Sequence, residues 1–277
     1  MRTIDLQFPD GSGANQRLVL ELDLGDVVQS DIWHSLKAGI FYEHETSRFF
    51  LRVARPGDVF YDIGANVGYF SLLLARLVGE AGKVVAFEAN PRNCAALVAA
   101  AARNAVDVKV EGVALADHDG TARFRDNGDG DSNGALSLDQ GGYEVRTVAL
   151  DSFIAAGGPV PKLMKIDVEG AELQVLRGGA GLFADPRLEF VICEFNVPQL
   201  ARFGTGLDDI IGFMAERGLH LYLLDHQGGL PRYVPPGVNV RMTSVANVLF
   251  ARHEALAKYW GEVVNECYVF ALNKEKG

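Results

Sequence analysis

The chain has 277 residues, of which 48% are hydrophobic, and its 26 Lys and Arg against 36 Asp and Glu give a formal net charge of −10. This length and composition suit one large domain with a sizeable core. The acidic balance predicts no nucleic-acid partner, because binding to a phosphate backbone needs a positive field.

The lack of a recognisable targeting signal, together with the cysteine spacing, predicts a cytoplasmic protein. Residues 1–10 lack the apolar core of a signal peptide, and no apolar run is long enough to span a membrane. Cys94, Cys193 and Cys267 lie far apart and in no metal-ligand spacing. This spacing predicts reduced structural thiols.

The first 55 residues are predicted to cap the main domain, residues 56–277, and not to form a domain of their own. Apolar and polar residues alternate over 4–8 and 17–24, around a turn with Pro and Gly, which predicts a β-hairpin. Residues 31–37 and 43–54 are predicted to be helices, the second of which stops before Pro56.

From Asp58 onward, strands and helices alternate. Asn90 precedes Pro91, a pair typical of a helix start. The predicted elements are strand 59–63, helix 67–78, strand 83–88, a helix from Pro91 to about Asn104, and strand 106–113. This order predicts a doubly wound α/β fold with a mostly parallel sheet.

Residues 126–142 interrupt this alternation with many Gly, Asp, Asn and Ser residues. They are interpreted either as a solvated loop or as a lid over an active site. The pattern then resumes with strand 143–150, a short helix capped by Asp151, strand 162–167, helix 171–178, strand 189–194, helix 207–217, and strands 219–225 and 245–250. The last two strands are expected to form an antiparallel pair at the sheet edge.

Two carboxylates end the first two strands of the main domain. The turn after Asp62 contains only Gly64 and Gly68, so the three-glycine pattern that cradles a pyrophosphate is incomplete. A carboxylate before this turn suits a cationic cofactor and disfavours a nicotinamide dinucleotide. Glu88, at the end of the next strand, can accept hydrogen bonds from ribose hydroxyls. The alternatives are a turn-forming Asp62 and a helix-capping Glu88.

Three stretches of the chain, residues 55–71, 87–91 and 163–172, together resemble the FkbM family of S-adenosylmethionine-dependent methyltransferases. The resemblance extends over roughly residues 40–250. It implies a Rossmann-like seven-stranded sheet and, usually, O-methylation of a sugar or another small-molecule hydroxyl. Ala89 departs from the family, which commonly has proline there.

The resemblance also implies a binding site for S-adenosyl-L-methionine. Glu88 is expected at the ribose and Asp117, with Ala116, at the adenine; a simple turn is the alternative for Asp117. The residues expected at the methionine end are Asp62, Gly64, Asn66 and Gly68.

Lys165, Asp167 and Glu169 alternate at the tip of a central strand, where ligand sites of such sheets lie. Asp167 is predicted to hold the cofactor's amino group or the acceptor hydroxyl. Glu169 is predicted to be the general base and Lys165 to stabilise the forming oxyanion. A purely structural ion pair is the alternative.

Further polar residues are predicted to contact the acceptor: Tyr42, Glu43, Glu194 and Asn196. Asp167, Glu194 and Asn196 also present the oxygen ligands that Mg²⁺ prefers, but the main prediction includes no metal. The sequence thus predicts an O-methyltransferase that acts on a small hydroxylated molecule. The alternatives are methylation of an amine or carboxyl group, also on a peptide, and cofactor binding without catalysis.

Overall fold

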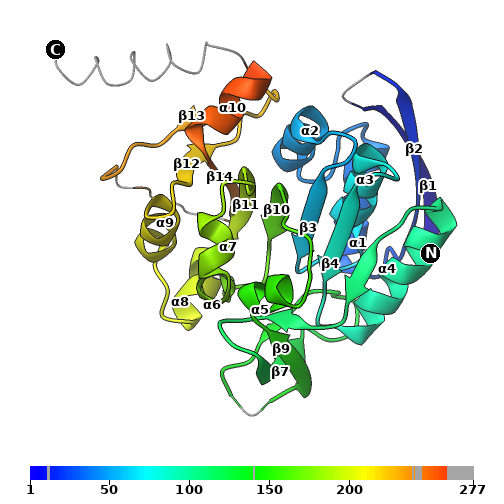
Figure 1. The fold of residues 1–277 in the computed structure, drawn as a ribbon. Coiled ribbons are helices and arrows are strands. Elements are labelled where there is room, and N and C mark those ends of the chain that lie inside the picture. Colours follow the sequence, from blue (N-terminus) through cyan, green and yellow to red (C-terminus); the bar gives the residue numbers. More distant parts are fainter. Residues whose placement is uncertain (11–12, 140, 239, 241–244, 261–277) are drawn as a thin grey trace.

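A computed structural model describes residues 1–10, 13–139, 141–238, 240 and 245–260, with a mixed β-sheet at its centre (Figure 1). Cys267 lies outside these residues, whereas Cys94 and Cys193 are free thiols. In spatial order the strands of the sheet are β13 (Arg232–Tyr233), β12 (His220–Leu223), β14 (Ala246–Ala251), β11 (Phe190–Phe195), β10 (Leu163–Ile166), β3 (Val59–Ile63), β4 (Lys83–Phe87) and β5 (Lys109–Glu111).

The strand directions confirm the predicted sheet. Strands β5, β4, β3, β10 and β11 are parallel, and β14 is antiparallel to both β11 and β12. The expected antiparallel pair at the edge is therefore present. The sheet has eight strands where seven were expected, because the short strand β13 pairs with β12.

Helices cover both faces of the sheet, as a doubly wound fold requires. In β3, Phe60 packs into one hydrophobic cluster and Tyr61 and Ile63 into the other. The helices are α1 (Val27–Lys37), α2 (His44–Val53), α3 (Tyr69–Val78), α4 (Pro91–Asn104), α5 (Leu150–Ala155), α6 (Glu172–Gly178), α7 (Ala180–Ala184), α8 (Val197–Arg202), α9 (Leu207–Ala215) and α10 (His253–Trp260). Within the part of the chain that is described, no helix has the length and apolarity needed to cross a membrane.

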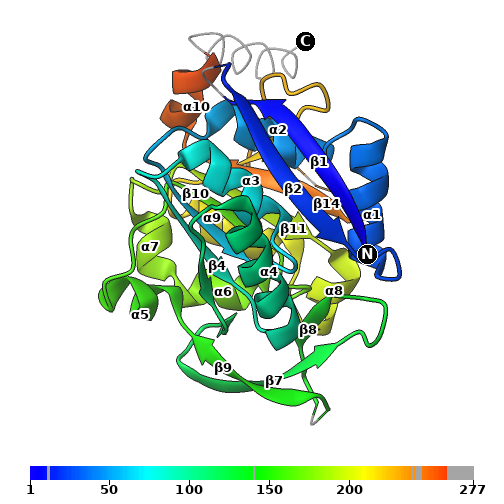
Figure 2. The same ribbon diagram turned by 90° about the vertical axis from the view of Figure 1, so that its right-hand side faces the viewer.

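The predicted hairpin is formed by β1 (Arg2–Pro9) and β2 (Asn15–Leu22), which pair antiparallel. It lies across α3 and α4 (Figure 2). The Asn104 side chain accepts a hydrogen bond from Val19 N at 2.7 Å and donates one to Val19 O at 2.8 Å. These bonds fix β2 to the end of α4, while its apolar side chains join the core cluster around α3.

Helix starts follow their capping residues. Asn90 accepts a hydrogen bond from Arg92 N at 2.9 Å, which confirms the predicted cap of α4. Helix α1 begins at Val27 and not at residue 31, because Asp26 accepts a hydrogen bond from Gln29 N.

The prediction for Asp151 was wrong. Helix α5 begins one residue earlier, at Leu150, and the Asp151 carboxylate reaches a different helix. Its two oxygens accept hydrogen bonds from Gly181 N and Leu182 N, both at 2.8 Å, in the first turn of α7. Asp151 thus satisfies free N–H groups at the start of α7 through a tertiary contact.

A second, four-stranded sheet lies between β5 and β10 in the sequence. Its strands, in spatial order, are β6 (Ala114–Leu115), β9 (Tyr143–Val148), β7 (Gly120–Asp126) and β8 (Gly134–Leu136). Of the predicted strand 106–113 only β5 is present, in the main sheet, and β8 occupies part of the expected loop 126–142. Strand β7 was missed because it buries only Phe124 fully and so gives a weak apolar signal.

Candidate active site

A cavity that is open to solvent lies at the carboxyl ends of the central strands, and its empty space, including the solvent at its opening, is about 900 Å³. Most of its walls come from the residues just before α2, the turn after β3, the ends of β4 and β10, and the segment between β7 and β8 with β8 itself. Side chains of α1, α3, α4, β6 and β7 add to the lining. Open α/β sheets bind their ligands at this edge.

The turn after β3 has a backbone that only small residues allow. Gly64 has φ 78°, and a Cβ atom there would lie 1.7 Å from the carbonyl oxygen of Asp167. Gly68 has φ 87°, and a Cβ atom there would lie 2.0 Å from the Cδ1 atom of Leu97. Asn66, between them, is also left-handed, with φ 50°. The two glycines therefore let the ends of β3 and β10 and the helix α4 approach the turn closely.

Asp62 and Glu88 flank this turn and both line the cavity. Asp62 is 2% exposed and accepts a hydrogen bond from Ser71 Oγ at 2.6 Å, and burial raises its pKa. Glu88 accepts hydrogen bonds from Asn66 N and Asn90 N, both at 2.7 Å. Burial raises the pKa of Glu88 to about 6. Glu88 thus joins the glycine turn to the start of α4 while it faces the cavity.

Ala116 and Asp117 are not among the residues that line the cavity. Strand β6 ends at Leu115, and pairing with β9 carries the following residues away. The Asp117 carboxylate instead contacts His118 Nδ1 at 2.6 Å. Their adenine role stays a prediction that the geometry does not support. Apolar side chains from nearby positions line this end of the cavity: Val113, Leu115, Phe124 and Leu136.

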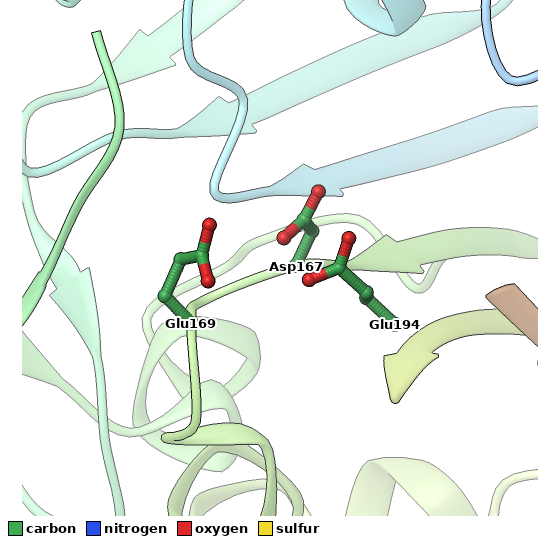
Figure 3. Close-up of side chains that lie close together, drawn as sticks. All are labelled: Asp167, Glu169 and Glu194. Atoms are coloured by element: carbon green, nitrogen blue, oxygen red, sulfur yellow. The ribbon is translucent and has the colours of Figure 1, made fainter. Parts of the chain in front are cut away.

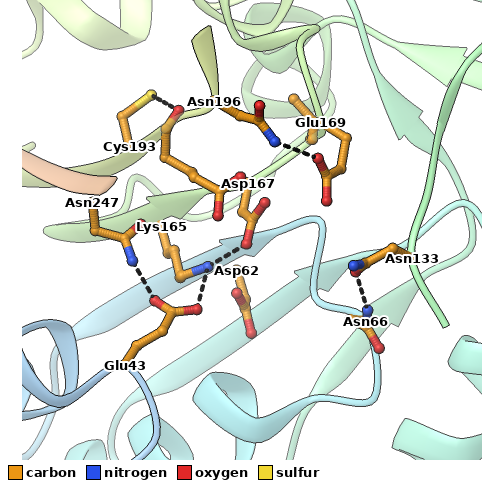
Figure 4. Close-up of polar contacts among 12 residues, drawn as sticks. Glu43, Asp62, Asn66, Asn133, Lys165, Asp167, Glu169, Cys193, Asn196 and Asn247 are labelled. Carbon is orange, nitrogen blue, oxygen red and sulfur yellow. Dashed lines mark hydrogen bonds and ion pairs between the residues drawn. The ribbon is translucent and has the colours of Figure 1, made fainter. Parts of the chain in front are cut away.

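Lys165 is a buried cation between two carboxylates (Figure 4). Its Nζ lies 2.7 Å from Asp167 Oδ2 and 3.4 Å from Glu43 Oε1. Burial alone would lower the pKa of Lys165, but Asp167, Glu43 and Glu194 raise it well above its usual value. Lys165 therefore stays charged, and Glu43 is held on its other side by Asn247 Nδ2 at 2.6 Å.

Asp167, the partner of Lys165, is one of three carboxylates that point toward one another (Figure 3). Asp167, Glu169 and Glu194 each offer an oxygen, and these oxygens lie within 4.8 Å of one another. Asn196 donates to Glu169 Oε2 at 3.2 Å. Burial, and then the charge of Asp167, raise the pKa of Glu169 to about 7 and also raise that of Glu194. The structure thus brings Glu194 and Asn196 next to the predicted catalytic residues, although neither lines the cavity itself.

The predicted acceptor residues of the N-terminal segment do line the cavity. The ring of Tyr42 packs edge-on against Tyr69, with centroids 5.4 Å apart, and burial raises the pKa of its hydroxyl. Glu43 precedes α2 with φ 41°.

Two groups of residues near the site were not predicted. Ser132 and Asn133, from the expected loop, line the cavity opposite the glycine turn, and only the lid interpretation had pointed to them. Glu172 lies beneath the turn after β10, fully buried. It accepts hydrogen bonds from Val168 N and Gly170 N at 3.2 Å each, and burial raises its pKa to about 7.

Comparisons with known proteins find similarity to methyltransferases. A family model described as the methyltransferase FkbM domain matches residues 62–221. The hexuronic acid methyltransferase AglP of Haloferax volcanii is 28% identical over 156 residues, which cover 56% of this chain and 62% of AglP. The chain therefore spans less than two thirds of the length of that relative.

Two further proteins share similarity with the chain. The 31-O-demethyl-FK506 methyltransferase FkbM of Streptomyces tacrolimicus is 33% identical over 194 residues, covering 57% of this chain and 74% of that protein. The solved structure of methyltransferase FkbM from Methylobacillus flagellatus KT has 14% identity and a TM-score of 0.44, over 74% of this chain and 50% of that one.

Proposed function

The chain belongs to the FkbM family of methyltransferases, and from this premise we propose that it transfers a methyl group from S-adenosylmethionine to a hydroxyl of a small molecule. A sugar or a natural product is the proposed acceptor. Two relatives support this class of acceptor, because their names describe methyltransferases for a hexuronic acid and for 31-O-demethyl-FK506.

The charge of the cavity is the observation that carries the proposal. Its acidic and basic side chains are five carboxyl groups and one lysine: Glu43, Asp62, Glu88, Asp167, Glu169 and Lys165. Such a lining attracts the sulfonium and ammonium groups of S-adenosylmethionine and repels a pyrophosphate. A nicotinamide dinucleotide is disfavoured for the same reason.

The polar and apolar ends of the cavity suit the two ends of this cofactor. Glu88 accepts hydrogen bonds from two backbone N–H groups and from the Asn93 side chain, and its two oxygens together keep an acceptor position for a ribose hydroxyl. The apolar side chains around Leu115 can enclose an adenine ring. At the other end, Asp62 and Asp167 can accept hydrogen bonds from an amino group.

In the proposed methyl transfer, each of the three charged side chains at the end of β10 has a role. Bound S-adenosylmethionine supplies a methyl group on a positively charged sulfur. Glu169 takes the proton of the acceptor hydroxyl, and its pKa of about 7 suits a base that works near neutral pH. The charge of Lys165 stabilises the negative oxygen that forms, and Asp167 orients the reactants.

We propose that this step needs no metal ion, because Lys165 already supplies positive charge to Asp167 at 2.7 Å. We also propose a cytoplasmic location, which the free thiols of Cys94 and Cys193 support, and no nucleic-acid partner, which the net charge of −10 supports.

Calorimetric titration with S-adenosylhomocysteine, with and without Mg²⁺, tests the cofactor assignment, and NAD serves as the contrasting ligand. We expect micromolar binding of S-adenosylhomocysteine that Mg²⁺ does not change, and no binding of NAD. A screen of hydroxylated sugars with labelled S-adenosylmethionine then tests the acceptor. Transfer only to amines or carboxyl groups would overturn the hydroxyl assignment, and absence of S-adenosylhomocysteine binding would overturn the function as a whole.

A further inference from the structure

The segment between β7 and β8 forms one wall of the cavity. We call residues 127–133 the strap. Its sequence, Asn127-Gly-Asp-Gly-Asp-Ser-Asn133, has no apolar side chain. Ser132 and Asn133 line the cavity together with Gly134 and Leu136 of β8, whereas the glycine turn and Glu88 line it from the main sheet. A ligand in the cavity would therefore lie between two segments that are far apart in the sequence.

Hydrogen bonds tie the strap to three parts of the protein: the start of α1 in the N-terminal segment, α4, and the glycine turn. Val27 N, at the start of α1, donates to Gly130 O at 2.9 Å. Ser132 Oγ donates to Asp26 Oδ1 at 3.0 Å. From α4, the buried Asn93 donates through Nδ2 to Ser132 O at 2.8 Å. These contacts hold the strap against the cavity, although it has no apolar core of its own.

The third tie lies at the cavity itself. Asn66 Oδ1 accepts a hydrogen bond from Val67 N at 2.7 Å, so its Nδ2 atom points outward and donates to Asn133 Oδ1 at 3.0 Å (Figure 4). Asn66 N meanwhile donates to Glu88 Oε2. The amide of Asn133 is thus linked through one residue to the carboxylate that the ribose is proposed to contact.

The backbone of Asn133 is fixed independently of this contact. Asn133 N donates to Asp131 Oδ1 at 2.9 Å, and Asn127 N donates to Asn133 O at 3.0 Å. The next residues run into β8, where Leu136 joins the apolar end of the cavity. Asn133 therefore sits where the polar and apolar parts of the cavity meet, which is the place of the nucleoside.

We infer that Asn133 is a cofactor-binding residue that contacts the nucleoside of S-adenosylmethionine, and that the strap closes over the bound cofactor. This inference rests on the proposed function. The strap is held by these hydrogen bonds and by one exposed ion pair, between Asp129 and Arg92 at 3.7 Å, and it buries no apolar side chain of its own. It can therefore open at low free-energy cost to admit and release the cofactor. Gly128 and Gly130, with φ 95° and 86°, supply the backbone freedom for this movement.

Two ligands separate the nucleoside from the amino-acid end: S-adenosylhomocysteine and 5′-methylthioadenosine, which lacks the amino-acid part. We expect Asn133→Ala to weaken the binding of both ligands by roughly tenfold in calorimetry. This is the size of effect expected for the loss of about one good hydrogen bond. Asp129→Ala is the matched control on the strap, because the Asp129 side chain is fully exposed and its 3.7 Å ion pair with the exposed Arg92 contributes little. It should change neither affinity by more than about twofold.

Each other outcome has a definite meaning. If Asn133→Ala binds both ligands as the unchanged protein does, the inference fails and the proposed function stands. Weaker binding of S-adenosylhomocysteine alone would place Asn133 at the amino-acid end and overturn the nucleoside assignment. If the unchanged protein binds neither ligand, the proposed function fails, and this inference with it.

Discussion

Asp62 is buried beside the glycine turn, and few groups stabilise its negative charge. Ser71 Oγ donates to Asp62 Oδ2, and Lys165 contributes a favourable charge nearby. The Asp62→Asn variant keeps the shape of the side chain and loses the charge. We expect it to weaken S-adenosylhomocysteine binding by about tenfold to a hundredfold, as for loss of one charged hydrogen bond.

Calorimetry on the folded variant measures this change, and circular dichroism verifies the fold. Asp58→Asn is a suitable control, because Asp58 pairs with Lys162 at 2.8 Å at the other end of β3. An affinity of Asp62→Asn equal to that of the control would remove Asp62 from the cofactor site.

Glu169 gives the proposed reaction a pH dependence of known sign. A base must be a carboxylate to take a proton, and the pKa of Glu169 is raised to about 7 by burial and by Asp167. The rate of methyl transfer should therefore rise as the pH rises through about 7 and level off above it. Glu169→Gln should lower the rate by about a hundredfold or more and remove this rise.

Single-turnover rates between pH 5.5 and 9, with an acceptor from the screen, test this prediction. S-adenosylhomocysteine affinity should change little in Glu169→Gln, since the residue is assigned to the proton and not to the cofactor. Full activity in the variant would exclude Glu169 as the base.

Lys165 and Glu43 should be coupled in stability. Lys165→Met leaves the carboxylates of Glu43 and Asp167 without their buried cation, and Glu43→Gln removes one of the two contacts of Lys165. In a double-mutant cycle by urea unfolding we expect a coupling free energy of about 1–3 kcal/mol. Strictly additive effects would show that the 3.4 Å contact contributes nothing to stability.

At the scale of elements, the sequence predicted those parts whose signals are local. The Asn90–Pro91 pair predicted the start of α4, and the predicted end of β3 placed Asp62 at the cavity. Both predictions held because a helix cap and a strand end depend on neighbouring residues. Strand β8 and helix α7 were missed, because elements of three and five residues show no clear periodicity.

Long-range contacts explain the remaining errors at the site. Asp151 caps α7 across 30 residues, a contact that a local helix-start pattern does not reveal. Asn133 reaches Asn66 only because the second sheet folds back over the cavity. The same sheet pairs β6 with β9 and so draws Ala116 and Asp117 away from the cavity. The resemblance predicted the residues of the glycine turn that line the cavity, but not the segment between β7 and β8 that forms another of its walls.

Arg252 directly follows β14, at the edge of the main sheet where β11 begins, and joins α7, the segment between α7 and β11, and the residues after α9. Its guanidinium donates to four backbone carbonyls, those of Phe183, Asp185, Leu188 and Arg217. Arg252→Met would leave these acceptors without their charged donor, and we expect the free energy of unfolding to fall by about 3 kcal/mol. Lysine should restore little of it, because it lacks the planar fork of donors.

Urea unfolding measures this loss, with Arg187→Met as control. Arg187 pairs with Asp185 at 2.7 Å but is 69% exposed, so its replacement should cost less than about 1 kcal/mol. Equal effects of the two replacements would show that the four carbonyl contacts of Arg252 do not stabilise the edge.

For the whole molecule, the N-terminal segment is part of the structure that forms the site. Phe8, Leu18 and Leu20 of the hairpin pack in the same core cluster as Leu72 of α3, and Glu43 reaches the cavity from the start of α2. We therefore propose that residues 1–55 and the main domain fold as one unit. The unit carries several buried carboxylates around one cavity, so its stability is linked to pH.

Glu172 allows this linkage to be tested away from the cavity. Burial raises its pKa from 4.5 to about 7 in the folded protein. Between these values the folded state binds a proton that the unfolded state has lost, so stability falls as the pH rises from about 4.5 to 7. A shift of this size corresponds to about 3 kcal/mol, all of it lost above pH 7.

The Glu172→Gln variant removes this titration and keeps an oxygen that can accept from Val168 N and Gly170 N. We compare the free energy of unfolding of the variant with that of the unchanged protein at each pH. This difference should shift in favour of the variant by about 2–3 kcal/mol from pH 5 to pH 8. Urea unfolding at both pH values gives the difference, and Glu80→Gln, at an exposed position, serves as control. If Glu172→Gln follows the pH dependence of the control, then Glu172 is ionised in the folded protein at pH 5, and the buried carboxylate beneath the turn after β10 does not limit stability at neutral pH.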